Sequence, residues 1–420
     1  MSLRVAWATP WNERSAIARF SASVCNALAG QGHHPEIVRI EVSEAARLPP
    51  LEGTHPVHAP GALPPGALAG EFDAVVVNLG NHYPFHGLAP RVLARTPCVA
   101  VLHDASMRHF AEEWRQATEP EPPAALLDRV VRAGLPLAPA LAQLACGAVV
   151  HGPHYRAEIA EACPGRVLQM PLAYEPPLVA APEPISGRLT VATVGHINAN
   201  KRVEAVIRAM GASPRLRASA RYQLIGPCDP AERERLLRLA ARVGAAPPEF
   251  TGWVPDTELV EHLAEVDVLT CLRHPVLEGG SASLVLALRS ARPVLVSDAG
   301  VYAELPEAVA LRCTPGEEAP DVLRHLEWIL DNPVAARHIG ERAAAWAREI
   351  FAPDAYAARL VPLLREAAQA APGIIAARAL GLAASRLGLD ADEPAVGRAV
   401  AVLAELVGYG CDAGGSGPGD

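Results

Sequence analysis

The clearest strand–loop–helix pattern in the chain is Val191-Ala192-Thr193-Val194-Gly195-His196-Ile197-Asn198-Ala199-Asn200-Lys201-Arg202. An apolar strand is predicted to end at Gly195, and a short polar loop then leads into a helix that begins near Arg202. Such a loop presents free N–H groups and the positive end of the helix dipole to an anion. Lys201 is the one lysine among 37 Lys and Arg residues, and a compact ammonium on a flexible stem suits a phosphate. The stretch therefore indicates a phosphate site, with a surface turn carrying a solvated Lys-Arg pair as the alternative.

Short apolar runs alternate with helical stretches on both sides of this unit. The alternation is typical of parallel sheets that are covered by helices on both faces. Strands are predicted over 4–8, 36–40, 73–77, 98–102, 147–150 and 166–169 in the first half, and over 189–194, 221–225, 249–251, 266–270, 293–297 and 309–312 in the second. Helices are predicted over 16–29, 108–116, 124–145 (broken near Pro136 and Pro139), 203–210, 231–243, 256–264, 283–290 and 321–329.

A proline-rich, mostly uncharged segment at 171–184 separates the two halves and indicates a semi-rigid linker. A chain of 420 residues also exceeds what one core usually organises. We therefore expect an N-terminal Rossmann-like domain (1–180), a second Rossmann-like domain (181–352), and C-terminal helices with a flexible tail (353–420). Two such α/β domains can face one ligand across a cleft with the carboxyl ends of their strands.

The composition is that of a soluble globular protein, with 50% hydrophobic and 20% charged residues. The net charge of −9 gives no general attraction to nucleic acid, so we expect no nucleic-acid partner. No signal peptide or bilayer-spanning apolar run stands out, and the eight cysteines form no C-x-x-C pair. We expect a cytoplasmic protein with reduced thiols and no transmembrane segment, and peripheral membrane contact stays open.

A second informative stretch runs Cys271-Leu272-Arg273-His274-Pro275-Val276-Leu277-Glu278-Gly279-Gly280-Ser281-Ala282-Ser283 and leads into a predicted helix. Its small residues let a ligand approach the backbone closely, and a serine can cap the helix. These small residues are Gly279, Gly280, Ser281 and Ser283. Glu278 can accept hydrogen bonds from sugar hydroxyls. A Gly/Ser helix start with an exposed glutamate is the simpler alternative.

Polar side chains in the first half also follow predicted strands. His103 follows the strand at 98–102, while Asn81 and His82 follow the strand at 73–77. The first strand leads into a candidate acceptor loop or lid that contains Asn12, Glu13, Arg14 and Ser15. His82 and His86 have the spacing of metal ligands, but Pro84 prevents one regular helix from carrying both. We therefore expect no metal site there.

Taken together, these segments resemble the family 4 retaining glycosyltransferases, which have the GT-B fold. The resemblance covers roughly residues 3–366. It is carried by Leu79-Gly80-Asn81, Val101-Leu102-His103-Asp104, the Gly195-to-Lys201 loop, Thr251-Gly252-Trp253, Leu272-Arg273-His274-Pro275 and Arg292-Pro293-Val294. It implies an α/β protein of two Rossmann-like domains facing each other across a cleft, with a C-terminal helical extension.

The resemblance implies an enzyme that moves a sugar from a nucleotide-diphosphate sugar to a hydroxyl acceptor, with retention at the anomeric carbon. The acceptor would be a glycan, a lipid-linked sugar or a small molecule. The resemblance places the diphosphate at Lys201, the sugar beside His103, and the nucleobase at Trp253 and Val254. His103, Lys201 and Glu278 are the expected catalytic residues. The donor site is expected to include Gly195, His196, Lys201, Trp253, Val254, Arg273, Glu278, Gly279, Gly280, Ser281 and Ser283.

We expect the enzyme to need no metal or other cofactor, because Lys201 and backbone N–H groups can neutralise the diphosphate. The string Asp390-Ala391-Asp392 has no strand before it, which argues against a metal-dependent transferase. Two positions depart from the family. The second glutamate of its E-x₇-E motif is Leu286 here, and His196 replaces the usual arginine beside the glycine.

Both departures favour one alternative, a catalytically weak protein that binds sugar nucleotides and partners an active transferase. A sugar-nucleotide epimerase with the same fold is a third hypothesis. It is less supported, because the L-R-x-P and Ser-rich segments match the transferases better.

Overall fold

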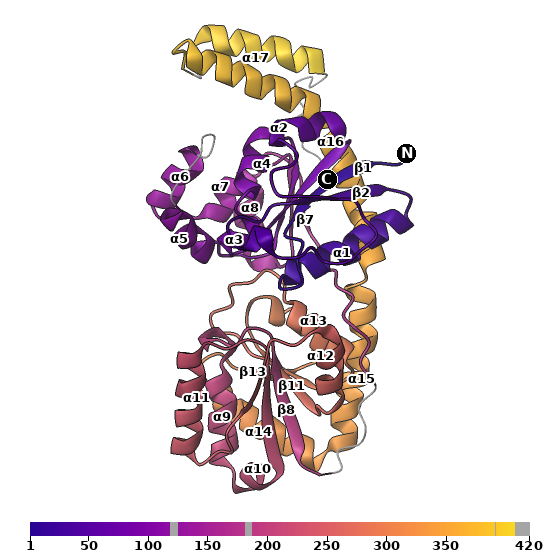
Figure 1. Cartoon of the computed structure of the whole chain (residues 1–420), viewed down its shortest axis with the longest axis vertical. Helices are drawn as coiled ribbons and strands as arrows, with labels where there is room; N and C mark the ends of the chain where they lie inside the picture. Colours follow the sequence, from indigo (N-terminus) through magenta and orange to yellow (C-terminus); the bar gives the residue numbers. More distant parts are fainter. Residues whose placement is uncertain (118–124, 181–186, 391, 408–420) are drawn as a thin grey trace, which may run out of the picture.

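Two parallel sheets, placed one beyond the other along the long axis of the molecule, organise the computed structural model of the chain (Figure 1). The structure describes residues 1–117, 125–180, 187–390 and 392–407. The first sheet has the strand order β3-β2-β1-β4-β5-β6-β7, and the second has the order β10-β9-β8-β11-β12-β13. In each sheet the order reverses beside the first strand of its domain, and such switch points are where open α/β sheets bind ligands.

Seven short strands form the first sheet, and all their pairings are parallel. They are β1 (Arg4–Thr9), β2 (His34–Arg39), β3 (Val57–His58), β4 (Ala74–Leu79), β5 (Val99–Leu102), β6 (Gly147–Val150) and β7 (Val167–Gln169). Alternate side chains of β1 enter different cores: Val5 and Trp7 pack on one face of the sheet, and Ala6 and Ala8 on the other. Burial on both faces explains why these strands read as continuous apolar runs.

The helices of the first domain form a layer on each face of its sheet. One face packs against α1 (Ala16–Gly30) and the first half of α16 (Pro353–Arg386). The other helices are α2 (Pro65–Glu71), α3 (Tyr83–His86), α4 (Ala89–Arg95), α5 (Arg108–Gln116), α6 (Ala125–Arg132), α7 (Leu137–Ala142) and α8 (Arg156–Ala162), with 3₁₀ turns η1 (Ala45–Arg47) and η2 (Pro153–Tyr155). Their apolar side chains, such as Leu93 and Phe110, fill the second core.

The second sheet is built in the same way from six parallel strands. They are β8 (Leu189–Val194), β9 (Ala220–Ile225), β10 (Glu249–Gly252), β11 (Val268–Cys271), β12 (Val294–Ser297) and β13 (Leu311–Cys313). One face packs against α9 (Val203–Ala212), α10 (Pro214–Ser219), α11 (Pro230–Val243) and α14 (Glu318–Asp331). The other packs against α12 (Asp256–Ala264), α13 (Ala282–Arg289) and α15 (Pro333–Ile350), and η3 (Ala199–Lys201) and η4 (Gly300–Tyr302) are 3₁₀ turns.

The predicted strands are confirmed to within two residues at each end, and one difference has a clear cause. The segment 49–70, in which no strand or helix was predicted, contains β3 and α2, which are too short to show a periodic apolar pattern. The break predicted in the helix 124–145 is confirmed: α6 and α7 are separate, and Pro136 sits at the N-cap of α7, where it cannot continue the preceding helix. The expected domain limits at 180 and 352 stay predictions, and the two sheets lie on either side of residue 180.

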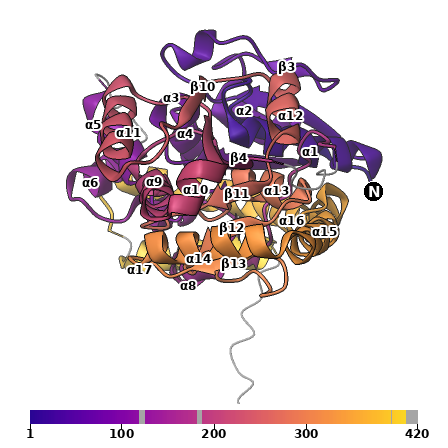
Figure 2. The ribbon, with the colours of Figure 1, turned by 90° about the horizontal axis from the view of Figure 1, so that it is seen from below.

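The C-terminal helices connect the two domains on one side. Figure 2, which looks along the long axis, shows α15 and α16 at the same side of the molecule. Tyr356, Leu360 and Leu364 of α16 are buried in the first domain's core, so the chain returns there after completing the second domain. The end of α16 then pairs with α17 (Pro394–Val407) at the end of the molecule farthest from the second domain (Figure 1). The tail from 408 onward lies outside the described residues.

One stretch in this region bears on the expected absence of a transmembrane segment. Within the described residues, the helical stretch 333–386 is long and apolar enough to cross a membrane by length and composition. Pro362 and Pro372 interrupt the apolar pattern of this stretch in the sequence, whereas α16 continues through both. Leu360 and Leu364, in the first half of α16, pack inside the first domain, whereas only 17% of the most apolar segment of this stretch is buried.

Candidate active site

The strand ends of both sheets meet in one cleft. Backbone groups from the two domains pair there: the Gly279 N–H donates to the His103 carbonyl over 2.9 Å, and the Ala105 N–H donates to the Leu277 carbonyl over 3.0 Å. Asp104 and Glu278 form an antiparallel bridge at the same place. The loop after β5 and the loop after β11 therefore touch directly and bring the predicted residues His103 and Glu278 to one site.

Lys201 lies folded back into the loop after β8. Its side chain is buried, and its Nζ donates a hydrogen bond to the Val194 carbonyl at 2.6 Å. Burial, together with the positive charge of Arg273, lowers the pKa of Lys201 from its usual value to about 7. A Cβ at Gly195 would lie 3.1 Å from Lys201 Nζ, and φ of Gly195 is +101°, so a glycine is required there. The lysine is thus packed inside the site rather than solvated on a surface turn.

Arg273 and Glu278 form a buried ion pair beside Lys201. Arg273 Nε lies 2.8 Å from Glu278 Oε1, and the Tyr302 hydroxyl donates to the same oxygen over 2.6 Å. The opposing effects of burial and of Arg273 leave the pKa of Glu278 lowered, so the carboxylate is charged. Its second oxygen accepts from the Leu277 N–H over 3.2 Å. Glu278 therefore holds Arg273 in place, a role that residue spacing alone does not predict.

The small residues after Glu278 are required by the neighbouring domain. A Cβ at Gly279 would lie 2.0 Å from the Tyr155 hydroxyl of the first domain. That hydroxyl accepts from the His151 N–H and donates to the Leu102 carbonyl, each at 2.8 Å. Ser281 caps α13, where its Oγ accepts from the Leu284 N–H. Gly279 therefore permits domain contact, in addition to any approach by a ligand.

His103 belongs to a buried chain of hydrogen bonds. Its Nδ1 lies 3.2 Å from His151 Nε2, its Nε2 lies 3.1 Å from Asn78 Oδ1, and His151 Nδ1 lies 3.0 Å from the Met170 carbonyl. Burial lowers the pKa of both histidines, to about 4 for His151. Each of these three contacts needs one N–H proton, but two neutral imidazole rings carry only two. One contact therefore has no proton until one of the two rings is protonated. Phe20 packs edge-on against both rings and fixes their orientation.

Asp104 is a residue of the site for which the sequence analysis predicts no role. Burial, and secondarily the charge of Glu278, raises its pKa to about 7, although it accepts a hydrogen bond from the Asn81 N–H at 2.7 Å. The signal that pointed to it was its place directly after His103 at a strand end. The same signal identifies His151 after β6. Tyr302 offers no comparable signal, because it lies in a 3₁₀ turn after β12.

The predicted acceptor-side residues border a 360 Å³ pocket in the cleft. Its lining includes Arg14, Ser15, Asn81, His82, His103 and Asp104. Asn12 instead donates to the buried Glu41 over 3.2 Å and accepts from the Arg14 N–H over 3.0 Å, which shapes the loop. Ser15 caps α1 through the Ala18 N–H. Glu13 is exposed and is not among the residues that line the 360 Å³ pocket.

The remaining donor-side positions differ in how exposed their side chains are. Trp253 follows Gly252 and exposes 49% of its surface, while Val254 packs partly against the second domain's core. His196 is exposed at the start of the Lys201 loop. Leu286 is buried among Leu284, Leu288 and their neighbours on the inner face of α13. Position 286, where the resemblance leads us to expect the second glutamate, therefore carries an apolar core side chain and offers no carboxylate to a ligand.

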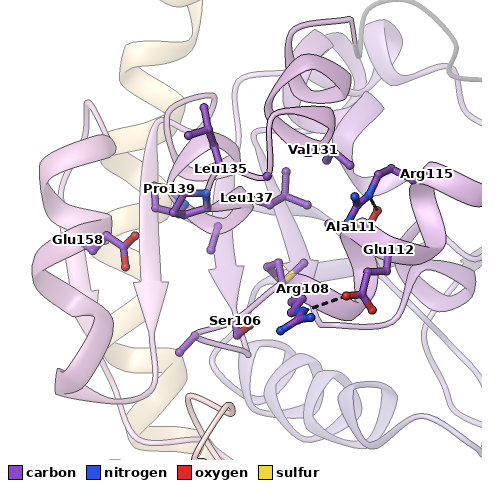
Figure 3. A pocket seen from close by; sticks show the side chains of 15 residues that line it. Ser106, Arg108, Ala111, Glu112, Arg115, Val131, Leu135, Leu137, Pro139 and Glu158 are labelled. Atoms are coloured by element: carbon purple, nitrogen blue, oxygen red, sulfur yellow. Dashed lines mark hydrogen bonds and ion pairs between the residues drawn. The ribbon is translucent and has the colours of Figure 1, made fainter.

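A second pocket of 560 Å³ lies in the first domain (Figure 3). It opens between α5 and α7, and Glu158 of α8 lies at one end. Arg108 pairs with Glu112 on one wall over 2.9 Å, and Arg115 lies on the same helix. Ser106 borders this pocket, and its backbone N–H donates to the carbonyl of Leu277 in the loop after β11. The pocket therefore lies next to the cleft.

Comparison with known proteins agrees with this geometry. Residues 180–346 match the family "Glycosyl transferases group 1". Anabaena Alr3699/HepE, solved in complex with UDP and glucose, is 17% identical over 86% of this chain and 99% of that chain, with a TM-score of 0.62. Sucrose-phosphate synthase from Thermosynechococcus elongatus is 17% identical over 86% of this chain and 98% of that chain, with a TM-score of 0.60. No curated protein sequence matches the chain.

A third solved structure, of WaaG, a glycosyltransferase involved in lipopolysaccharide biosynthesis, is 16% identical over 85% of this chain and 99% of that chain, with a TM-score of 0.56. At these identities the structural likeness shows the GT-B fold. The sequence match covers the domain that holds Lys201, Arg273 and Glu278. Residues 180–346 therefore match the group 1 glycosyl transferases, and the chain shares the GT-B fold with these solved structures along most of its length.

Proposed function

We propose that this glycosyltransferase uses a UDP-sugar as its donor, with the diphosphate at Lys201 and Arg273 and the sugar facing His103. The observation that carries the proposal is the burial of the only lysine beside a buried arginine at the switch point of the second sheet. Arg273, and a lysine whose protonation a bound anion would favour, suit a ligand with concentrated negative charge, although Glu278 balances part of the charge of Arg273. The fold is shared with HepE, whose complexes contain UDP, UDP-glucose, or UDP and glucose.

In this proposal the chemistry is departure of the nucleoside diphosphate from the anomeric carbon. Negative charge develops on the diphosphate, and Lys201 and Arg273 stabilise it from fixed positions. Glu278 keeps Arg273 oriented through its Oε1, which also accepts the hydrogen bond of the Tyr302 hydroxyl. His103 lies in the 360 Å³ pocket, where it can position the sugar or polarise a hydroxyl. A hydroxyl acceptor then attacks on the face from which the leaving group departs, which gives retention.

Lys201, Arg273 and backbone N–H groups can neutralise the diphosphate, so we propose that transfer needs no metal ion. We place the reaction in the cytoplasm. The seven cysteines among the described residues are all free, which suits a reducing compartment.

The test is a donor screen with the purified full-length chain. Each of several UDP, GDP and ADP sugars is incubated with the protein, and released nucleoside diphosphate and free sugar are measured by mass spectrometry. We expect UDP release from one UDP-sugar, and its loss in Lys201→Ala. Release from GDP or ADP sugars alone would refute the choice of nucleotide.

Leu286 supports a second candidate, a sugar-nucleotide-binding partner of an active transferase. Because the residue is core rather than a hydroxyl acceptor, one donor contact typical of the family is missing. This candidate predicts that UDP-sugars raise the thermal stability of the chain while no UDP is released, with or without added acceptors. Turnover in the donor screen would exclude it.

A further inference from the structure

Three side chains with metal-binding atoms converge beside the cleft, outside the donor site. His82 comes from the loop after β4, and His109 and Glu113 lie one helical turn apart on α5. One ligand atom from each residue lies within 4.8 Å of those of the other two. Glu113 Oε1 is 3.8 Å from His82 Nε2 and 3.5 Å from His109 Nε2.

These separations approach those of a tetrahedral metal site. Ligand atoms about 2.0–2.1 Å from a zinc ion stand roughly 3.4 Å from one another. The two distances to Glu113 are within a few tenths of an ångström of that value, and the exposed His109 side chain can rotate to close the remaining gap. Two imidazoles and a carboxylate are a donor set that zinc and neighbouring transition metals prefer over magnesium or calcium.

Backbone groups around the cluster already orient it. The Tyr83 N–H donates to Glu113 Oε2 over 2.8 Å, so the other oxygen, Oε1, faces the two rings. The Phe110 N–H donates to Asn81 Oδ1 over 2.9 Å and fastens the same loop to α5. Outer hydrogen bonds of this kind are what hold metal-binding carboxylates in position.

The His82 ring offers its Nε2, which lies 3.8 Å from Glu113 Oε1, as the candidate ligand atom. Its Nδ1 is buried without a hydrogen-bond partner among the described residues, and its Nε2 is too far from Glu113 for a hydrogen bond. His86, which the sequence spacing paired with His82, is not part of the cluster: its Nδ1 lies 3.0 Å from the Asn78 carbonyl. The proline that prevents a His82–His86 site has no bearing on a site built between a loop and another helix.

We propose that His82, His109 and Glu113 bind one zinc-class divalent ion, with a fourth position open to water or ligand. The ion joins the loop after β4 to α5. Because His82 also lines the 360 Å³ pocket, the ion lies at the edge of the space next to His103. The site is separate from Lys201 and Arg273, so it does not supply the charge that the departing diphosphate needs.

The test measures metal binding by the full-length chain after treatment with a chelator and desalting. Zinc is titrated against a chromophoric chelator, and cobalt binding is followed by visible d–d absorption. We expect one zinc ion per chain and cobalt bands typical of a four- or five-coordinate nitrogen–oxygen site. The variants are His109→Ala and Glu113→Gln, the second of which can still accept the Tyr83 N–H hydrogen bond.

Loss of a direct ligand should weaken zinc binding by more than the roughly 10–100-fold that loss of an outer partner costs. His338→Ala is the matched control, because His338 is an exposed histidine on α15 far along the chain; its zinc affinity should equal that of the wild type. Circular dichroism verifies that the variants fold, which we expect since His109 is exposed. No zinc binding by the wild type, or equal affinity in both variants, would overturn the proposal.

Discussion

Binding of a nucleoside diphosphate should change the protonation of Lys201. In the free protein, burial and Arg273 bring its pKa to about 7, so at pH 8 about one lysine in ten carries a proton. A bound diphosphate adds negative charge next to the ammonium and raises its pKa again. Above pH 7, binding must therefore take up a proton. Below pH 6 the lysine is already charged, and uptake at this residue should vanish.

The magnitude follows from the free-state pKa. At pH 8 the uptake at Lys201 should approach 0.9 proton, and at pH 6 it should fall to about 0.1. Protonating the lysine costs about 1.4 kcal/mol for each pH unit above 7, so affinity for UDP should weaken about tenfold per unit until the bound-state pKa is reached. Arg273, Cys271 and Glu278 are the other titratable groups that act on this lysine.

Calorimetry with UDP in buffers of different ionisation enthalpy measures the number of protons taken up. Lys201→Ala should lose this uptake and bind UDP about 10- to 100-fold more weakly, as expected for loss of a charge-assisted hydrogen bond. Lys201→Arg should bind with an affinity that does not fall above pH 7, because arginine stays charged there. We expect it to restore affinity only in part, because the planar guanidinium has a different geometry.

Asp104 provides the necessary control, since its pKa is also near 7 and an incoming anion would raise it. Asp104→Asn should remove any uptake at that carboxyl and leave the uptake at Lys201 intact. If the wild type shows no dependence on the buffer at pH 8, or if Lys201→Ala keeps the full uptake, then Lys201 does not face the diphosphate.

Four further outcomes are expected. His151→Phe keeps the ring contact with Phe20 but removes the hydrogen bond to His103, so kcat should fall by about two- to tenfold with little change in donor KM; an unchanged kcat would mean that His151 does not position His103. Tyr302→Phe removes the hydrogen bond from the Tyr302 hydroxyl to Glu278, and UDP affinity measured by calorimetry should drop by about two- to tenfold. Unchanged affinity would contradict the role of Tyr302 and Glu278 in orienting Arg273. Leu286→Ala should lower the free energy of unfolding by about 2–5 kcal/mol in a denaturant titration, as for any buried leucine, and a loss below 1 kcal/mol would place the side chain outside the core. Turnover should survive EDTA; loss of turnover that Mg²⁺ restores would show that the diphosphate needs a metal.

Much of the fold was predictable because it depends on local patterns. Runs of apolar residues buried on both faces, short loops and helical periods recur along the chain, and β8, α5 and α12 begin and end where the pattern predicts. The lysine in the loop after β8 was also identifiable, since one lysine among 37 basic residues is a signal that needs no structure. The protonation state of Lys201 could not be predicted, because its burial and its distance to Arg273 depend on packing between separate loops.

The two parallel sheets and the loops that follow their strands could be predicted from local patterns, since each depends on residues close together in the chain. Only the tertiary structure decided how those loops act on one another. It placed Tyr155 against Gly279, gave Glu278 to Arg273 and Tyr302, joined His151 to His103, and brought His109 and Glu113 beside His82. Such contacts join residues from different strands and helices, and their energies depend on distance and burial, which appear only when the chain has folded.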